Sequence, residues 1–174
     1  MKLPLIYYGN PLLRKKAAPV SEITAEIRKF IDDMLDTMIA TNGLGIAAPQ
    51  VGRSLAIFIT SPPIGDDKGS FEQAPPRVFI NPRLSNPSED SWCHSEACLS
   101  IPKVYGDVFR PVRITVTAQD INGKEFTEIF TGWPARVIIH ENDHINGLLF
   151  IDRISVQERK QIEAKLRQIK KQHS

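Results

Sequence analysis

The clearest pattern of apolar and polar positions lies in the first quarter of the chain, where apolar residues recur every three or four positions. They are Ile23, Ile27, Phe30, Ile31, Met34, Leu35 and Met38. This spacing places them on one face of a helix. The helix is predicted to begin near Thr24 and to end at Asn42 and Gly43, because glycine commonly follows the last turn.

The middle of the chain shows short apolar runs separated by turn residues. Residues 55–60, 77–81, 112–118 and 125–130 are the predicted strands. Asn122 and Gly123 lie between the last two, and this dipeptide favours a tight β-hairpin turn. Residues 61–76 are rich in proline, glycine and charge, so they are predicted to form a surface excursion.

Two more helices are predicted toward the end of the chain. Pro134 suits the first turn of a helix that runs to about Asn146 and Gly147. Ser155 and Glu158 form a capping-box pattern that opens the last helix. Its apolar stripe is Ile162, Leu166 and Ile169, and its basic residues are Arg159, Lys160, Lys165, Arg167, Lys170 and Lys171. The pattern therefore predicts an α+β fold: an N-terminal helix, small, mostly antiparallel sheets packed around a central helix, and a C-terminal helix.

Length and charge limit the alternatives. The chain has 174 residues, which suits a single domain (1–174) with a core that needs no disulfide. Its net charge of +2 gives no overall case for direct, specific nucleic-acid binding or for membrane binding. Neither a signal-peptide apolar region nor a transmembrane-length run is present, so a cytoplasmic location is expected.

The predicted central helix carries the pattern His140-Glu141-Asn142-Asp143-His144. Residues four apart lie above one another on a helix, so both imidazoles can face one metal ion. A carboxylate beside that ion can take the proton of a water that the metal activates. The pattern indicates a metal-dependent hydrolase. The alternative interpretation is a charged amphipathic helix whose histidines are solvated or packed in the core.

The sequence after this pattern offers no convincing third ligand. A metzincin protease would have histidine where this chain has Phe150. The late carboxylates are Asp152, Glu158 and Glu163. The first lies too close to the pattern, and the others belong to a strongly basic helix.

The upstream sequence offers two cysteines, Cys93 and Cys98, which are the only ones in the chain. One thiolate with two histidines forms a catalytic metal set that leaves a position open for water. An inert buried cysteine is the first alternative. A disulfide between the two is the weaker alternative, because nothing in the sequence indicates an oxidising compartment.

Three separated motifs resemble those of the peptide deformylase family. Residues 96–100, EACLS, are similar to its EGCLS motif; residues 43–50, GLGIAAPQ, to GxGxAAxQ; and residues 140–147, HENDHING, to HExDHxxG. The order and spacing agree, and the resemblance runs from about Tyr8 to the C-terminal helix. It implies removal of the N-formyl group from the formylmethionine of newly made polypeptides.

The resemblance also implies roles for individual residues. Cys98, His140 and His144 would hold one divalent metal, Glu141 would be the general base, and the Gln50 amide with the Leu99 N–H would stabilise the oxyanion. Gly45, Ile46, Tyr105, Trp133 and Val137 would form the substrate site, with Gly45 allowing close approach and Val137 as a wall of the methionine pocket. Iron(II) is the expected metal in the cell, with zinc, nickel or cobalt substituting. Glu96 would support the motif loops. The residues of the basic C-terminal helix by themselves favour a helix docked on the body with a solvated basic face, and the resemblance adds the ribosome as a partner of this helix.

Two positions depart from the family pattern. Ala97 replaces the glycine of EGCLS and would be strained if that position needs a positive φ. Ile139 stands where a glutamine usually precedes the first histidine, which removes a polar group that could support the metal. Neither change removes a ligand, base or oxyanion donor, so activity is expected.

Three other functions compete with this interpretation. Residues 43–48 fit the loose dinucleotide pattern GxGxxA, but that pattern needs a strand before it and a helix after it, and here the order is reversed. A metallopeptidase that cuts an internal peptide bond is the main enzyme alternative. A metal-binding scaffold without activity is the alternative from another class.

Overall fold

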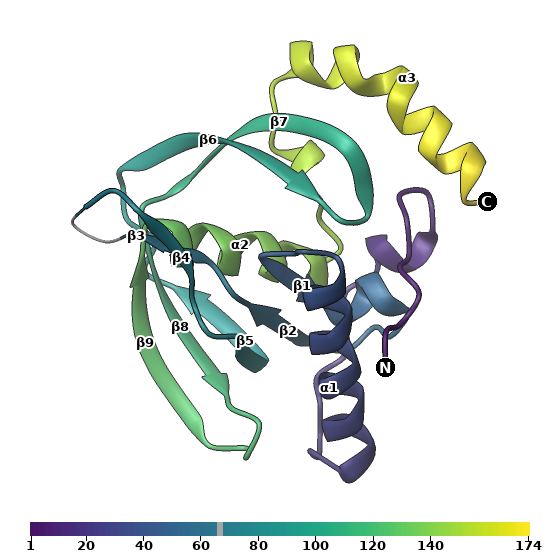
Figure 1. Ribbon diagram of the computed structural model, residues 1–174. Coiled ribbons are helices and arrows are strands. Elements are labelled where there is room, and N and C mark those ends of the chain that lie inside the picture. The colour runs from purple at the N-terminus through teal and green to yellow at the C-terminus, as the bar shows by residue number, and fades with distance from the viewer. Residues whose placement is uncertain (66–67) are drawn as a thin grey trace.

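The computed structural model describes residues 1–65 and 68–174 and confirms the predicted α+β fold (Figure 1). In chain order the elements are η1 (Pro11–Arg14), α1 (Ala25–Ala40), β1 (Gly45–Ala47), η2 (Ala48–Val51), β2 (Ile57–Thr60), β3 (Pro63–Gly65), β4 (Phe71–Gln73), β5 (Arg77–Ser85), β6 (Ser91–Cys98), β7 (Ile101–Pro111), β8 (Arg113–Gln119), β9 (Glu125–Thr131), α2 (Trp133–Ile145), η3 (Phe150–Asp152) and α3 (Val156–Gln172). The predicted excursion at 61–76 contains the small β3–β4 hairpin, and its residues 66–67 lie outside the described part.

A five-stranded antiparallel sheet in the order β1-β2-β5-β8-β9 separates α1 from α2. Alternate residues of its strands point to opposite faces. Ile57 and Ile59 of β2 pack with α1, whereas Phe58 between them packs with α2. Four of the five strands overlap the predicted ones. The short β1 was not predicted.

The predicted start of α1 is confirmed, since Thr24 Oγ1 accepts a hydrogen bond from Ile27 N–H as its N-cap. The helix ends at Ala40, two residues before the predicted stop. Five of the seven apolar residues that the periodicity selected are buried, and the other two are partly buried against the same cluster. The buried five are Ile27, Phe30, Ile31, Met34 and Met38.

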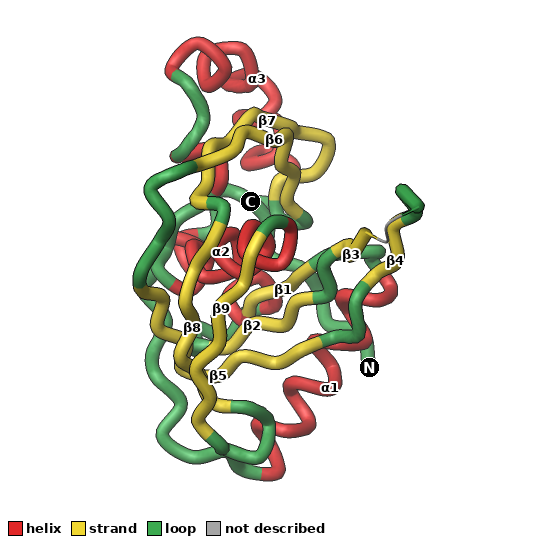
Figure 2. Tube along the Cα trace, turned by 90° about the vertical axis from the view of Figure 1, so that its left-hand side faces the viewer, coloured by secondary structure: helices red, strands yellow, loops and turns green. Residues whose placement is uncertain are grey.

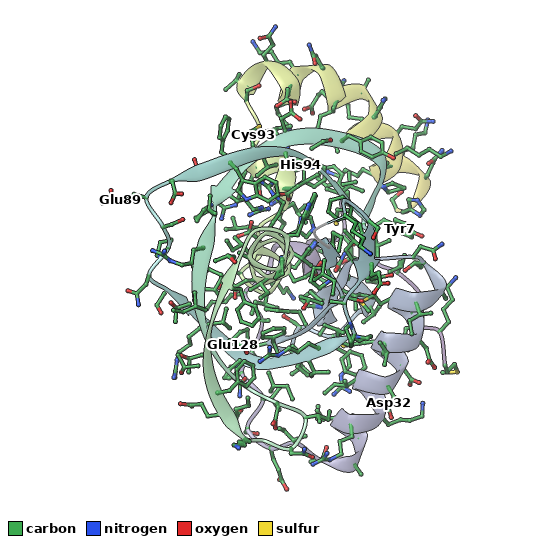
Figure 3. The ribbon with its side chains drawn as sticks, turned by 60° about the vertical axis from the view of Figure 1, so that its left-hand side comes forward. Tyr7, Asp32, Glu89, Cys93, His94 and Glu128 are labelled. Atoms are coloured by element: carbon green, nitrogen blue, oxygen red, sulfur yellow. The ribbon has the colours of Figure 1, made fainter. Side chains whose placement is uncertain are left out.

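A second antiparallel hairpin, β6–β7, covers the other side of α2, and α3 packs on the outside of this hairpin (Figures 1 and 2). No strand was predicted for residues 91–111, so this hairpin corrects the prediction from the sequence. Its pairing runs from Ser91 opposite Pro111 to Glu96 opposite Gly106, and then shifts so that Cys98 lies opposite Ile101. The helix α2 is therefore enclosed between two sheets, and Figure 3 shows it nearly end-on at the centre of the molecule.

The N-terminal segment ties distant parts of the chain together. Ile6 N–H donates to the Gln50 carbonyl at 2.7 Å, Tyr8 N–H to the Ser100 carbonyl at 2.9 Å, and Ala17 N–H to the Ile145 carbonyl at 2.8 Å. Arg14 forms an ion pair with Asp152 at 2.6 Å. Each of the three motif regions is thus bonded to residues 6–17.

Among the described residues, no helix combines the length and the apolar character needed to cross a bilayer.

Candidate active site

Three soft or borderline donors meet at the end of β6. Cys98 is the last residue of β6, and His140 and His144 lie one turn apart on α2. Their ligand atoms all lie within 4.8 Å of one another, and His144 Nε2 is 3.3 Å from Cys98 Sγ. The fold thus brings the three predicted ligands to one point. Both cysteines are free in the structure, which excludes the disulfide alternative.

Glu96 orients the first histidine. His140 Nδ1 is 2.9 Å from Glu96 Oε1, and Arg110 binds both oxygens of the same carboxylate at 2.6 and 2.8 Å. Burial opposes the charge, but the hydrogen bonds from Arg110 and His140 outweigh it and hold the pKa of Glu96 well below its usual range. An ionised Glu96 can only accept, so His140 Nδ1 donates and Nε2 remains free for a metal.

The donor set fits a divalent cation. Burial and the neighbouring His140 lower the pKa of His144 well below its usual value, so its imidazole is neutral and can bind a metal. Burial also opposes the charge on His140, but hydrogen bonds to Cys98 and Glu96 outweigh this and raise its pKa to about 10. Metal binding must therefore displace a proton from this cluster.

Glu141 is buried beside these ligands and packs against β1. Burial raises the pKa of Glu141 to about 7, which is close to the value that suits a base at neutral pH. Its Oε2 has no hydrogen-bond partner among the described residues. A Cβ atom at Gly45 would lie only 2.5 Å from Glu141 Oε1. The absence of a side chain at position 45 is therefore what gives this carboxylate its place.

Gln50 is held so that its amide nitrogen faces the same point. Its Oε1 accepts from Ala47 N–H at 2.9 Å, which leaves Nε2 directed to Ser100 Oγ at 3.2 Å and Cys98 Sγ at 3.5 Å. The side chain is 1% exposed. A fixed N–H donor beside the three predicted metal ligands can stabilise negative charge that develops on a substrate oxygen.

A cavity of about 640 Å³ opens next to this cluster. Several predicted site residues line it: Gly45, Gln50, Leu99, Tyr105, Trp133, Val137, His140 and Glu141. Ile46 does not; its fully buried side chain packs with α1, because alternate residues of β1 point to opposite faces of the sheet. His94, which was not predicted as a site residue, also lines the cavity, and Figure 3 shows it on β6 next to Cys93.

The two departures from the family pattern are accommodated. Ala97 lies in β6 and does not have a positive φ, so the backbone strain considered for alanine at this position is absent. Ile139 packs against the apolar cluster shared by α2 and the five-stranded sheet. Its side chain therefore has apolar neighbours.

A largely buried ion network was not predicted from the sequence. Besides Glu96 and Arg110, it contains Arg136, whose Nη1 donates to Glu96, and Asp143, which accepts from Arg110 at 3.0 Å and from Arg153 at 2.6 Å. One signal was available: Arg136, His140 and Asp143 recur at three- and four-residue spacing, which predicts a charged stripe on α2. Its burial depends on partners far away in the sequence.

Comparison with known proteins gives a consistent result. The sequence profile described as polypeptide deformylase matches residues 2–160 of the chain. A peptide deformylase of Christiangramia forsetii is 42% identical, over 98% of this chain and 91% of that protein. The crystal structure of peptide deformylase from Ehrlichia chaffeensis is 32% identical with a TM-score of 0.89, over 99% of this chain and 97% of that one. A Met-Ala-Ser-bound class I type b peptide deformylase from Acinetobacter baumannii is 34% identical with a TM-score of 0.82, over 88% of this chain and 99% of that one. Fold, sequence and coverage agree, and the chain belongs to the polypeptide deformylase family.

Proposed function

We propose that this metal-dependent deformylase uses Cys98, His140 and His144 as its metal ligands and Glu141 as its general base. The observation that carries the proposal is the convergence of three metal donors, a buried carboxylate and the Gln50 amide at one end of a cavity of about 640 Å³. Metallopeptidase activity has no comparable support, because the family match covers residues 2–160.

The cation would supply a water of lowered pKa and polarisation of the formyl carbonyl. Glu141 takes the proton of the attacking water and returns it to the leaving amine, so that formate and a free N-terminus result. Gln50 Nε2 and the Leu99 N–H donate to the formyl oxygen as negative charge develops on it. Glu96 keeps the Nδ1 proton of His140 in place throughout.

We assign the substrate's first side chain to the part of the cavity near Trp133 and Val137. Both residues line the cavity, and Val137 is buried whereas Tyr105 at the mouth is 66% exposed. An apolar methionine side chain gains most from the buried wall. Gly45 of β1 also lines the cavity.

The metal is proposed to be iron(II) in the cell. A thiolate with two imidazoles also accepts zinc, cobalt or nickel, so the ligand set alone does not choose among them. Elemental analysis of anaerobically purified protein tests the assignment. Zinc in stoichiometric amount and no iron would refute it.

The activity is tested with formyl-Met-Ala-Ser, measuring formate and the free amine. The wild type is expected to release formate, whereas Glu141→Ala should retain the metal and lose about 100- to 10,000-fold in kcat, the typical contribution of a general base. Glu128→Ala, an exposed glutamate on β9, is the matched control and should behave as wild type. Cleavage of an internal peptide bond would favour the metallopeptidase, and metal binding without any reaction would favour the inactive scaffold.

We also propose that the protein is cytoplasmic and acts on newly made polypeptide chains. The ribosome is the proposed partner of α3. Exposed basic residues on this helix are Lys160, Lys165, Arg167, Lys170 and Lys171, whereas Ile162, Leu166 and Ile169 are buried. The Lys170 side chain also packs on Gly9, so its substitution would disturb packing as well as charge. The test therefore reverses the charge of Lys165 and Lys171 with Lys165→Glu and Lys171→Glu. Unchanged sedimentation of this variant with ribosomes would refute the partnership.

A further inference from the structure

We infer that Arg136 is a positioning residue that joins the metal ligand His140 to the rim of the substrate cavity. The inference rests on the proposed function, because it takes His140 as a ligand and the cavity as the substrate site. Arg136 lies one turn before His140 on α2, so both side chains project from the same face. It is 1% exposed. Its two Nη atoms donate to Glu96, to the Val108 carbonyl and to the Trp92 carbonyl, whereas its Nε has no hydrogen-bond partner among the described residues. Two groups of these contacts link the guanidinium to the metal ligand and to the cavity.

The first group leads to the metal. Arg136 Nη1 donates to Glu96 Oε2, while the other oxygen of this carboxylate accepts from His140 Nδ1 at 2.9 Å. Arg110 contacts both oxygens from β7. The Glu96 carboxylate is thus fixed between two guanidinium groups from different elements. It cannot rotate without breaking bonds to both, and this fixes the direction of the His140 ring.

The second group leads to the cavity mouth. Arg136 Nη2 donates to the Trp92 carbonyl at 2.7 Å, and its guanidinium carbon lies 4.3 Å from the Trp92 ring centroid. The ring of Trp92 contacts that of Trp133 edge-on, with 5.4 Å between the ring centroids. The centroids of the Trp133 and His94 rings are 4.5 Å apart. Trp92, His94 and Trp133 are called the aromatic rim here. Trp133 and His94 both line the cavity, so the support of Trp92 reaches surfaces that a substrate can touch.

One planar fork makes both sets of contacts at once. A lysine could return a positive charge to Glu96, but a single ammonium cannot also bond the Trp92 carbonyl and cover the Trp92 ring. Arginine and lysine at position 136 should therefore differ at the rim more than at the metal. This difference separates a positioning role from a simple need for a buried cation.

The experiment compares wild type, Arg136→Met, Arg136→Lys and the control Arg77→Met. Arg77 also lies over aromatic rings and pairs with a glutamate, but it is on β5, outside the cavity. Zinc affinity is measured by chelator competition, kcat and KM with formyl-Met-Ala-Ser, and folding by thermal unfolding of the metal-free protein. The absorption spectrum of the cobalt(II)-loaded protein reports the geometry of the ligands directly.

Arg136→Met is expected to weaken zinc affinity about 10- to 100-fold, as loss of support for a ligand does, to change the cobalt spectrum and to raise KM. Arg136→Lys should recover most of the zinc affinity but keep the raised KM. Arg77→Met should change neither. If Arg136→Met does not fold, Arg136→Lys carries the test through its raised KM at nearly normal zinc affinity.

The inference is overturned if folded Arg136→Met matches Arg77→Met in zinc affinity and KM, or if Arg136→Lys restores both equally. Failure of the proposed function would look different. Wild-type protein would then release no formate, while chelator competition on the Arg136 variants would still decide whether this residue supports the metal site.

Discussion

The two long sides of α2 are both buried, yet they are built from opposite kinds of residue. The side toward the five-stranded sheet carries Ala135, Ile138 and Ile145, which pack with Phe58 and Phe79. The side toward β6–β7 carries ionisable groups, of which the arginine and the aspartate are equally buried and the histidine side chain is 12% exposed. Those are Arg136, His140 and Asp143. The apolar side stabilises the helix through non-directional contacts, whereas the charged side is stable only as a closed network, in which each member compensates another.

The largest predicted effect comes from opening that network at its centre. Glu96→Gln keeps the shape of the side chain but leaves Arg110 and Arg136 without their shared carboxylate. Breaking a buried ion pair in this way costs about 3–5 kcal/mol of stability. Zinc affinity should also fall, because His140 loses its orienting acceptor. Urea unfolding of the metal-free protein and chelator competition measure the two effects.

The surface pair of Glu128 and Arg77 is the reference for this change. Both residues are about half exposed, and removal of an exposed ion pair costs about 1 kcal/mol or less. A Glu96→Gln variant no less stable than Glu128→Gln would mean that the buried network adds nothing to the fold.

The next effect tests the apolar side. Ile138→Ala removes a 1% exposed side chain from the cluster with the sheet, and truncation of a buried isoleucine costs about 2–5 kcal/mol. Zinc affinity and kcat per folded molecule should stay as in wild type, because Ile138 touches no ligand. The urea midpoint should fall with an unchanged slope. A loss of zinc affinity would show that the two sides of α2 are not independent.

A smaller effect is expected where β1 meets the general base. In Gly45→Ala the new methyl group would lie 2.5 Å from Glu141 Oε1, so the carboxylate must move. We expect kcat to fall about tenfold, which corresponds to 1.4 kcal/mol in the barrier, with zinc affinity retained. The double variant with Glu141→Asp is the control. If crowding is the cause, Gly45→Ala should cost much less in the background of the shorter acid.

The smallest effect belongs to the half-exposed pair of Arg14 and Asp152. Burial alone would raise the pKa of Asp152, but hydrogen bonds from Arg14 and the Leu149 N–H lower it below its usual value. The unfolded chain then takes up the proton first. The contribution of ionised Asp152 to the free energy of unfolding is therefore complete above the ordinary aspartate pKa of about 3.9. It is lost as the pH falls below that value and through the lower pKa of the folded state. The difference in urea midpoint between wild type and Asp152→Asn should shrink in acid. A difference that is constant with pH would contradict this.

The sequence was sufficient for elements whose buried face is apolar. The periodicity of Ile27, Phe30 and Met34 predicted α1, and the short apolar runs of β2 and β8 predicted strands, because these side chains face hydrophobic clusters. The strand β6 could not be predicted from an apolar pattern. Its inward residues include Glu96 as well as Cys98, so a strand buried against a charged helix face has no apolar alternation to recognise. The strand β7 is also hard to predict, because it contains Pro102 and Gly106 and its pairing with β6 shifts register.

The same distinction applies to the site. His140 and His144 could be found because helical spacing alone brings them together. Arg136 could not, since an arginine on a helix is normally expected in solvent, and only the fold supplies Glu96 and Trp92 as its partners. Ile46 is the reverse case, a predicted substrate-site residue whose side chain is fully buried. Its place in a motif suggested substrate contact, but the strand turns its side chain into the core.

The bonds from residues 6–17 to Gln50, Ser100, Ile145 and Asp152 also constrain how the protein folds. Arg14 and Ala17 can reach their partners Asp152 and Ile145 only after nearly the whole chain has formed. Contacts between residues so far apart close large loops, and topologies rich in them fold slowly. The metal site should thus be completed in one late, cooperative step rather than assembled motif by motif.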